Sequence, residues 1–245
     1  MTRAVADPDF RYAGSELDLF KKARNWKAYW RARIAEFVRG EVLEVGAGIG
    51  ANTLALAGLA YERWTCLEPD AVLAARIELP PGGRHKTVVG TVADLSADTK
   101  FKAVLYDTIL YIDVLEHIED DRGEMARAAA RLKPGGALIV MVPAHPFLFT
   151  PFDAAIGHFR RYTRASLLAT SRTAAPETLR TEKLVYLDAA GLLASAGHRV
   201  LLRGAMPTEW QILIWDRLLV PVSRLIDPIF AGRVGKNVLG VWRKA

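Results

Sequence analysis

The stretch that most constrains the fold covers residues 42–57 and contains three glycines spaced two apart. Its first residues, 42–45, form a short, largely apolar run that is typical of a buried strand. The chain then turns through Gly46, Gly48 and Gly50, and the residues that follow suit a helix. A strand, a glycine loop and a helix in this order open a doubly wound α/β domain. Such a domain binds its ligand where the loop meets the carboxyl ends of the strands.

The glycine loop fits more than one kind of ligand. Gly46, Gly48 and Ala51 satisfy the relaxed fingerprint of NAD-binding loops. Glu44 favours another ligand, because its carboxylate at the strand end would repel a pyrophosphate a few ångströms away. A ligand with an ammonium and a sulfonium group, such as S-adenosylmethionine (SAM), would instead be attracted. A glycine turn that binds no ligand is the remaining interpretation.

At these positions the sequence resembles the class I SAM-dependent methyltransferases, whose loop reads acid-x-Gly-x-Gly-x-Gly. Glu44, Gly46, Gly48 and Gly50 occupy all four positions, and the resemblance is strongest over residues 38–162. The resemblance implies an α/β fold with a single doubly wound, mostly parallel seven-stranded sheet whose last strand is antiparallel.

The domain organisation follows from the same pattern. The fourth strand is predicted over residues 101–108, and the antiparallel last strand over residues 237–243. We expect a helical N-terminal cover over residues 1–38 and a helical insertion near the C-terminus over residues 188–232. The chain carries no internal repeat or linker, so it is predicted to be a single domain, residues 1–245.

Acidic residues after the second and third strands extend the predicted cofactor site. Glu68 lies 22 residues after Gly46, where a carboxylate can accept hydrogen bonds from both ribose hydroxyls of SAM or NAD. In the family that the sequence resembles, an acid after the third strand binds the adenine amino group. Asp94 matches that place, with Leu95 beside the ring, although an ordinary turn aspartate is the alternative.

Residues 109–118 resemble the family segment x-x-Val-Leu-Glu-His-Ile, which lines the methyl-transfer cleft. The resemblance implies that Tyr111 and Asp113 lie nearest the cofactor. Glu116 and His117 are expected to fix the loop by hydrogen bonds rather than to act as an acid–base pair. The complete set of predicted cofactor-binding residues is Glu44, Gly46, Ala47, Gly48, Gly50, Glu68, Pro69, Asp94, Leu95, Tyr111 and Asp113.

The segment after the fifth strand carries the residues best placed for substrate chemistry. It includes His145 and a Gly-His-x-Arg-Arg-Tyr run over residues 157–162, a run also seen in one broad branch of the family. His145 or His158 could take a proton from the acceptor, and Arg160 and Arg161 could hold an anionic group on it. A structured loop without a chemical role is the third interpretation, because alignment alone accelerates methyl transfer. The predicted catalytic residues are His145, His158, Arg161 and Tyr162, and no metal ligand is predicted.

The composition restricts the partners. Lysine and arginine number 33 against 27 acids, a net charge of +6, but the charges are scattered, so no nucleic-acid partner is expected. The single cysteine, Cys66, rules out an internal disulfide and a cysteine metal cluster, and its predicted burial disfavours thiolate chemistry on an acceptor. Because we find neither a signal-peptide pattern nor a spanning apolar run, we expect a cytoplasmic protein.

Residues 208–227 have a wide apolar arc with few charges, and Pro221 is expected to break or kink this helix. The arc could pack on the domain, cap an apolar or lipid-linked acceptor, form a homodimer, or lie peripherally on a membrane. The sequence as a whole predicts SAM-dependent methyl transfer to oxygen or nitrogen of a small-molecule or lipid-like acceptor. An NAD-dependent oxidoreductase and a non-catalytic SAM-binding interaction subunit are the alternatives.

Overall fold

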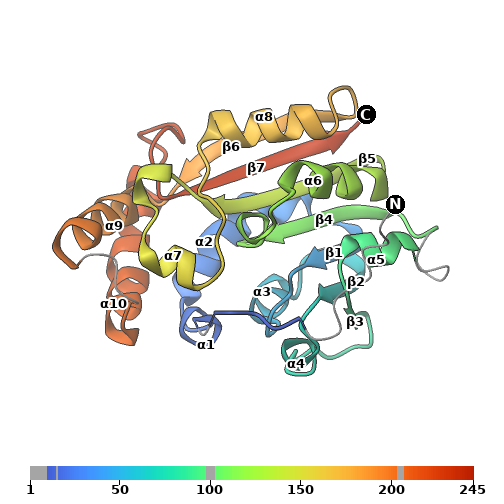
Figure 1. The fold of residues 1–245 in the computed structure, drawn as a ribbon, viewed down its shortest axis with the longest axis horizontal. Coiled ribbons are helices and arrows are strands. Elements are labelled where there is room, and N and C mark those ends of the chain that lie inside the picture. The colour runs from blue at the N-terminus through green and yellow to red at the C-terminus, as the bar shows by residue number, and fades with distance from the viewer. Residues whose placement is uncertain (1–9, 15, 98–102, 203–206) are drawn as a thin grey trace.

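The computed structural model describes residues 10–14, 16–97, 103–202 and 207–245. Its centre is a seven-stranded sheet in the order β3-β2-β1-β4-β5-β7-β6, in which β7 alone is antiparallel to its neighbours (Figure 1). This arrangement confirms the predicted fold class. The strands are β1 (Gly40–Val45), β2 (Tyr61–Glu68), β3 (His85–Val89), β4 (Tyr106–Ile112), β5 (Leu132–Pro143), β6 (Leu179–Leu187) and β7 (Asn237–Lys244).

Helices cover both faces of the sheet. They are α1 (Leu17–Phe20), α2 (Arg24–Ile34), α3 (Ala51–Leu56), α4 (Ala71–Ala74), α5 (Val92–Ala97), α6 (Asp121–Arg131), α7 (Pro151–Ala155), α8 (Arg164–Ala174), α9 (Ala189–Leu202), α10 (Glu209–Ile214) and α11 (Val220–Ile226). Side chains alternate between the faces along each strand. Val42 and Leu110 therefore pack with α2 and α3, whereas Leu43 and Ile109 pack with α5, α6 and α8.

The carboxyl ends of the central strands meet at one edge of the sheet. Val45 at the end of β1 lies beside Leu67 of β2 and Tyr111 of β4. Pro143 at the end of β5 lies beside Asn237, the first residue of β7. Because β7 runs antiparallel, its beginning joins the edge at which the parallel strands end, and this edge carries the candidate site.

The fourth strand lies further along the chain than predicted. It covers residues 106–112 rather than 101–108, and residues 98–102 lie outside the described part of the chain. The apolar residues that we assigned to the cleft segment therefore belong to the strand itself. Only the last residue of the strand, Ile112, borders the cleft, together with Asp113 and part of the segment that follows it.

Helices α10 and α11 form one helical rod with the turn between them, so of the break or kink expected at Pro221 the break does not occur. The π-helical turn η4 (Trp215–Leu219) joins α10 to α11, and the Val220 N–H bonds to the Trp215 carbonyl five residues back. This wider turn precedes the proline, whose ring could not follow an undistorted α-helix. Residues 203–206 of the predicted insertion, like residues 1–9 and 15 of the predicted cover, lie outside the described residues.

Buried aspartates attach this rod to the N-terminal helix α2. Asp216 accepts the Trp26 N–H at 2.8 Å, and Asp227 accepts the Tyr29 hydroxyl at 2.6 Å. The N-terminal helix α2 and the C-terminal rod therefore form one wall beside the sheet edge. In the ranges that the structure describes, no helix combines the length and apolarity needed to cross a membrane.

Candidate active site

A cavity of about 380 Å³ opens at the carboxyl edge of the sheet. It lies between the glycine loop after β1, helices α1 and α2, the segment after β5, and the C-terminal rod. Such a mainly apolar pocket with a few convergent polar groups suits an organic ligand. Its apolar and aromatic lining includes Leu17, Phe20, Trp26, Trp30, Leu148, Phe152, Ile156, Ile212 and Trp215.

The glycine loop brings bare backbone to the cavity. Gly46, Gly48 and Gly50 have φ values of 66°, 56° and 78°, a region that glycine enters without strain. A Cβ on Gly46 would lie only 2.6 Å from the Val114 side chain, so this position has no room for a larger residue. Gly46, Ala47 and Gly48 line the cavity, whereas Gly50 lies outside its lining. A ligand can therefore approach the first part of the loop closely.

Glu44 lies behind the loop, outside the cavity lining. Its Oε2 accepts hydrogen bonds from the Thr53 hydroxyl at 2.6 Å and from the Trp64 indole N–H at 2.9 Å. Its Oε1 has no hydrogen-bond partner among the described residues. Burial raises the pKa of Glu44 to about 7, although the two hydrogen bonds oppose this shift. The side chain thus ties β1 to α3 and β2, and any contact with an ammonium would have to come from Oε1.

Glu68 lies at the end of β2, where the N-terminal segment covers it. Its two carboxylate oxygens accept the N–H groups of Gly48 at 2.7 Å and of Asp70 at 2.9 Å. Tyr12 donates its backbone N–H to Asp70 at 2.9 Å, and a Cβ on Gly48 would lie 3.5 Å from the Leu17 side chain. Each Glu68 oxygen keeps a lone pair for a ribose hydroxyl, but the carboxylate lies outside the cavity lining.

The other predicted nucleoside contacts lie further from the cavity. Asp94 accepts hydrogen bonds from the Thr91 N–H at 2.8 Å and from the Thr91 hydroxyl at 2.7 Å, as turn aspartates do. Leu95 is buried in the core between the sheet and α6, and Pro69 is half-buried before α4. Contact of Asp94, Leu95 and Pro69 with the cofactor therefore stays a prediction.

Of the two residues predicted nearest the cofactor, Tyr111 lies inside β4 and Asp113 follows its last residue. Tyr111 is fully buried and donates its hydroxyl to Glu124 of α6 at 2.8 Å, away from the cavity. Asp113 lines the cavity and has a φ of 56°, which is uncommon for a residue with a side chain. Loss of hydration raises the pKa of Asp113 to about 6, although neighbouring cationic groups partly offset this rise. Asp113, but not Tyr111, is positioned to meet a ligand.

His158 and Arg161 both line the cavity and share one partner, Asp153 of α7. His158 Nδ1 lies 3.0 Å from Asp153 Oδ1, and Arg161 donates from Nε and Nη2 to the two carboxylate oxygens at 2.8 and 2.9 Å. Burial opposes ionisation of Asp153, but the hydrogen bonds from His158 and Arg161 hold its pKa below the ordinary value. Asp153 therefore fixes the orientation of both predicted catalytic side chains.

His145 and Tyr162 lie outside the cavity lining. The His145 ring stacks on Tyr186 with centroids 4.9 Å apart, and its Nε2 lies 2.9 Å from the Gly235 carbonyl oxygen. The Tyr162 hydroxyl donates to Asp121 at 2.8 Å, and burial raises the pKa of the phenol. These contacts give both side chains a packing role and place neither against the cavity.

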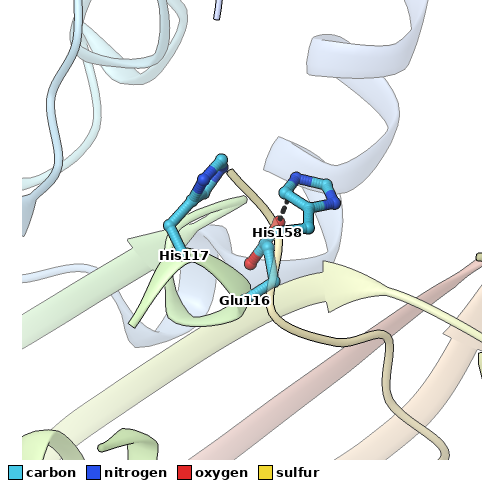
Figure 2. Close-up of side chains that lie close together, drawn as sticks. All are labelled: Glu116, His117 and His158. Carbon is cyan, nitrogen blue, oxygen red and sulfur yellow. Dashed lines mark ion pairs between the residues drawn. The ribbon is translucent and has the colours of Figure 1, made fainter. Parts of the chain in front are cut away.

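Glu116 and His117 line the cavity next to His158 (Figure 2). The expected hydrogen bonds of the Glu116 side chain are not found, since neither carboxylate oxygen has a partner in the part of the chain that the structure describes. Only its backbone carbonyl accepts, from the Phe159 N–H at 2.9 Å. Burial, together with the charge of Asp113, raises the pKa of Glu116 well above its usual range. Burial lowers the pKa of His117 to about 4.

Sequence reasoning missed three lysines that line the cavity, Lys21, Lys27 and Lys236. Lys27 of α2 donates to the Phe20 carbonyl at 2.6 Å, and loss of hydration lowers its pKa to about 8. Lys236 lies 3.7 Å from the ring centroid of Trp215 and 3.8 Å from Asp188, and burial lowers its pKa. Lys236 could have been predicted from the sequence. It directly precedes the antiparallel strand, which begins at the carboxyl edge of the sheet, and this places the lysine beside the site.

Comparison with known proteins adds to this geometry. A family described as "Methyltransferase domain" matches residues 20–180. A demethylmenaquinone methyltransferase of Tropheryma whipplei is 31% identical over 131 residues, which cover 51% of this chain and 53% of that protein. A ubiquinone biosynthesis O-methyltransferase of Xanthomonas euvesicatoria is 32% identical over 107 residues, covering 43% of this chain and 44% of that protein. The chain spans about half the length of these curated relatives.

Solved structures extend the likeness over almost the whole chain. The N-methyltransferase NodS from Bradyrhizobium japonicum, in complex with S-adenosyl-L-homocysteine, has a TM-score of 0.55 to this structure at 16% identity. The superposition covers 94% of this chain and 89% of that chain. At this identity the likeness concerns the fold, and it includes the N- and C-terminal regions beyond the matched family domain.

Proposed function

The chain belongs to the methyltransferase-domain family, with the fold of its class I SAM-dependent members, and from this premise we propose that it methylates an oxygen or nitrogen atom of an apolar small-molecule acceptor. The observation that carries the proposal is the cavity, which reaches glycine-loop backbone and is otherwise lined by aromatic, aliphatic and imidazole side chains. The names of the relatives, which concern demethylmenaquinone and ubiquinone biosynthesis, support an apolar acceptor.

The residues at the loop fit SAM, which supplies a methyl group on a positively charged sulfur. Gly46, Ala47 and Gly48 present backbone to the cavity, and Asp113 adds a carboxylate beside it. Glu68 would hold the ribose hydroxyls with its remaining lone pairs. Because Leu17 lies against the loop, we expect the N-terminal segment to move aside as the nucleoside enters.

Titration calorimetry with SAM, its demethylated product and NAD tests the cofactor. We expect binding of the first two and none of NAD. Tight NAD binding with neither SAM nor its product bound would overturn the proposal and favour an oxidoreductase. SAM binding without methyl transfer across a panel of quinols, phenols and amines would instead favour a non-catalytic binding subunit.

His158 is the side chain best placed to act on the acceptor. Asp153 holds its Nδ1, and its Nε2 lies on the side of Glu116, 3.9 Å from the carboxylate. Nε2 could therefore receive a proton from the acceptor as the methyl group transfers. Arg161 is already engaged by both oxygens of Asp153, so it is less suited to hold an anionic acceptor. Alignment of the acceptor with the methyl group would supply the rest of the acceleration.

We expect His158→Ala to lower turnover without changing SAM affinity. His85→Gln is the matched control, because this histidine contacts Tyr61 on the edge strand β3 far from the cavity residues. Turnover in His158→Ala equal to that of the control would remove His158 from the proposed chemistry.

An exposed apolar stripe on the C-terminal rod supports a membrane-bound acceptor. The side chains of Trp210, Leu218, Leu225 and Ile229 are 69%, 62%, 77% and 79% exposed. Helical spacing places Trp210, Leu218 and Leu225 on one side of the rod, and Ile229 lies in the turn that follows α11. We define the stripe as the exposed large apolar side chains of this region, which are Trp210, Ile214, Leu218, Val222, Leu225, Ile229 and Phe230.

The charges beside the stripe favour an anionic lipid surface. Arg217 and Arg224 are exposed on the same rod, whereas Asp216 and Asp227 are buried. Glu209 is an exposed acid of this rod, and it pairs with Lys22 at 2.7 Å. An apolar stripe flanked by arginines is the pattern of helices that lie in a membrane interface. We therefore propose peripheral docking of this face on anionic membranes.

Co-sedimentation with phosphatidylglycerol and phosphatidylcholine vesicles tests this docking. We expect Leu225→Ser to weaken binding to the anionic vesicles, and Val72→Ser, at a 53% exposed apolar position on α4, to leave it unchanged. Equal binding of both variants, or no binding by the unmodified chain, would refute membrane docking. Light scattering would show whether the stripe forms a homodimer instead.

A further inference from the structure

A carboxylate and two imidazoles meet in the cavity wall. Glu116, His117 and His158 each offer one donor atom, and these atoms all lie within 4.8 Å of one another. Figure 2 shows the two rings beside the Glu116 carboxyl group, with the Glu116–His158 ion pair dashed. Glu116 and His117 come from the turn η2 (Leu115–His117) after β4, and His158 comes from the segment after α7. Two separate parts of the chain thus build the cluster.

Among the residues that the structure covers, the Glu116 carboxyl group makes no hydrogen bond with its side-chain oxygens, and its contact with His158 Nε2 is long, at 3.9 Å. The Glu116 residue is 0% exposed. An ionised carboxylate buried in this way carries a large desolvation cost unless a cation or donor lies against it. The unpartnered oxygens, next to two imidazoles, indicate that this group is arranged to receive a positive charge.

Both imidazoles have outer contacts that fix their orientation. His158 Nδ1 is held by the Asp153 carboxylate at 3.0 Å, which leaves Nε2 for another partner. The His117 ring packs edge-on against His158, with centroids 4.5 Å apart, and against Tyr12, with centroids 5.4 Å apart. A carboxylate behind an imidazole, as Asp153 stands behind His158, is a usual support of histidines that ligate metals.

From these contacts we propose that Glu116, His117 and His158 bind one divalent transition-metal cation such as Zn²⁺. Two imidazoles and a carboxylate suit such a cation better than Mg²⁺ or Ca²⁺, which prefer oxygen ligands alone. The donor atoms would have to close from up to 4.8 Å to roughly 3.4 Å for tetrahedral coordination, a rotamer-scale movement. Three protein ligands leave a fourth position open to the cavity, where an acceptor oxygen can bind.

This site deepens the proposed function, on which its chemical role rests. An acceptor hydroxyl bound to the cation loses its proton to water more readily. Its oxygen then forms the bond to the methyl carbon, while the carbon–sulfur bond breaks and its electron pair stays on sulfur. In this arrangement His158 is a metal ligand and does not receive the proton, so metal binding decides between its two roles.

The test measures metal binding alone, on the full chain without SAM. Titration with Zn²⁺, and with Co²⁺ followed by visible absorption, should show one saturable site. Glu116→Gln and His158→Ala should each weaken it about tenfold or more, whereas His85→Gln, which removes an imidazole elsewhere, should not. Circular dichroism confirms that each variant is folded.

Two results would overturn the site. One is the absence of saturable binding to the folded chain, which would leave the contacts of His158 with Glu116 and Asp153 as the explanation of the cluster. The other is equal affinity in Glu116→Gln, His158→Ala and the unmodified chain. SAM binding measured on the same samples separates this failure from that of the proposed function. SAM binding without metal binding overturns only the metal site, and metal binding without SAM binding overturns only the methyltransferase proposal.

Discussion

Replacing Glu44 with glutamine should remove a large part of the pH dependence of folding stability. Burial raises the folded-state pKa of Glu44 from 4.5 to about 7, and the hydrogen bonds from Thr53 and Trp64 offset only part of this rise. Because each pKa unit corresponds to about 1.4 kcal/mol, the shift amounts to about 3 kcal/mol of folding free energy.

The direction of the pH dependence follows from the state, folded or unfolded, in which Glu44 binds its proton more tightly. Below about pH 4.5 Glu44 is protonated in both the folded and the unfolded chain, and it has no electrostatic cost. As the pH rises, the unfolded chain ionises first, so the free energy of unfolding falls until the folded pKa of about 7 is passed. Linkage gives a loss of about 2.5 kcal/mol between about pH 5 and pH 8. Glu44→Gln stays neutral throughout and should lack this loss.

Urea unfolding followed by circular dichroism at both pH values measures the effect. The glutamine amide lacks a partner for its nitrogen, but that cost is the same at both pH values and cancels in the comparison. Glu62→Gln, at an exposed position on the neighbouring strand β2, is the control and should follow the unmodified chain within about 0.5 kcal/mol. A pH dependence of Glu44→Gln equal to that of the control would refute the reasoning.

Three further variants test the cofactor site and the attachment of the C-terminal rod. Glu68→Ala should weaken SAM binding by about 1–3 kcal/mol through lost hydrogen bonds, as measured by calorimetry. Gly48→Val should abolish SAM binding while circular dichroism stays unchanged, and retained affinity would argue against the loop as the binding site. Tyr29→Phe removes the 2.6 Å hydrogen bond to Asp227 and should lower the free energy of unfolding by about 1–3 kcal/mol in urea titrations.

Local patterns predicted the fold well, whereas one strand boundary misplaced a site residue. The glycine loop was predictable because three closely spaced positive φ values require glycine. Strand β4 ends in the apolar and aromatic run Ile109–Ile112, and such a run carries no periodicity that marks its end. Its continuation to Ile112 places Tyr111 and Ile112 on opposite faces, so Ile112 lines the cavity and Tyr111 contacts α6.

The polar part of the site depended on contacts between distant segments, which no local pattern contains. Asp153 is predictable as the third residue of a capping box after Thr150. That it also orients His158 and Arg161 follows only from the folding of the loop after α7. The cluster around Glu116 was likewise missed, because the family motif led us to expect side-chain hydrogen bonds for this residue.

The proposed membrane docking of the C-terminal rod would connect the choice of acceptor to the place where the protein acts. Its inner side lines the cavity with Ile212 and Trp215, and its outer side exposes Leu218 and Leu225. A helix is roughly 10–12 Å across, so a lipid surface on the outer side would lie one helix diameter from the cavity. If this face docks on a membrane as we propose, an acceptor that resides there accounts for both sides of the rod at once. A homodimer through the same face would account for the outer side alone.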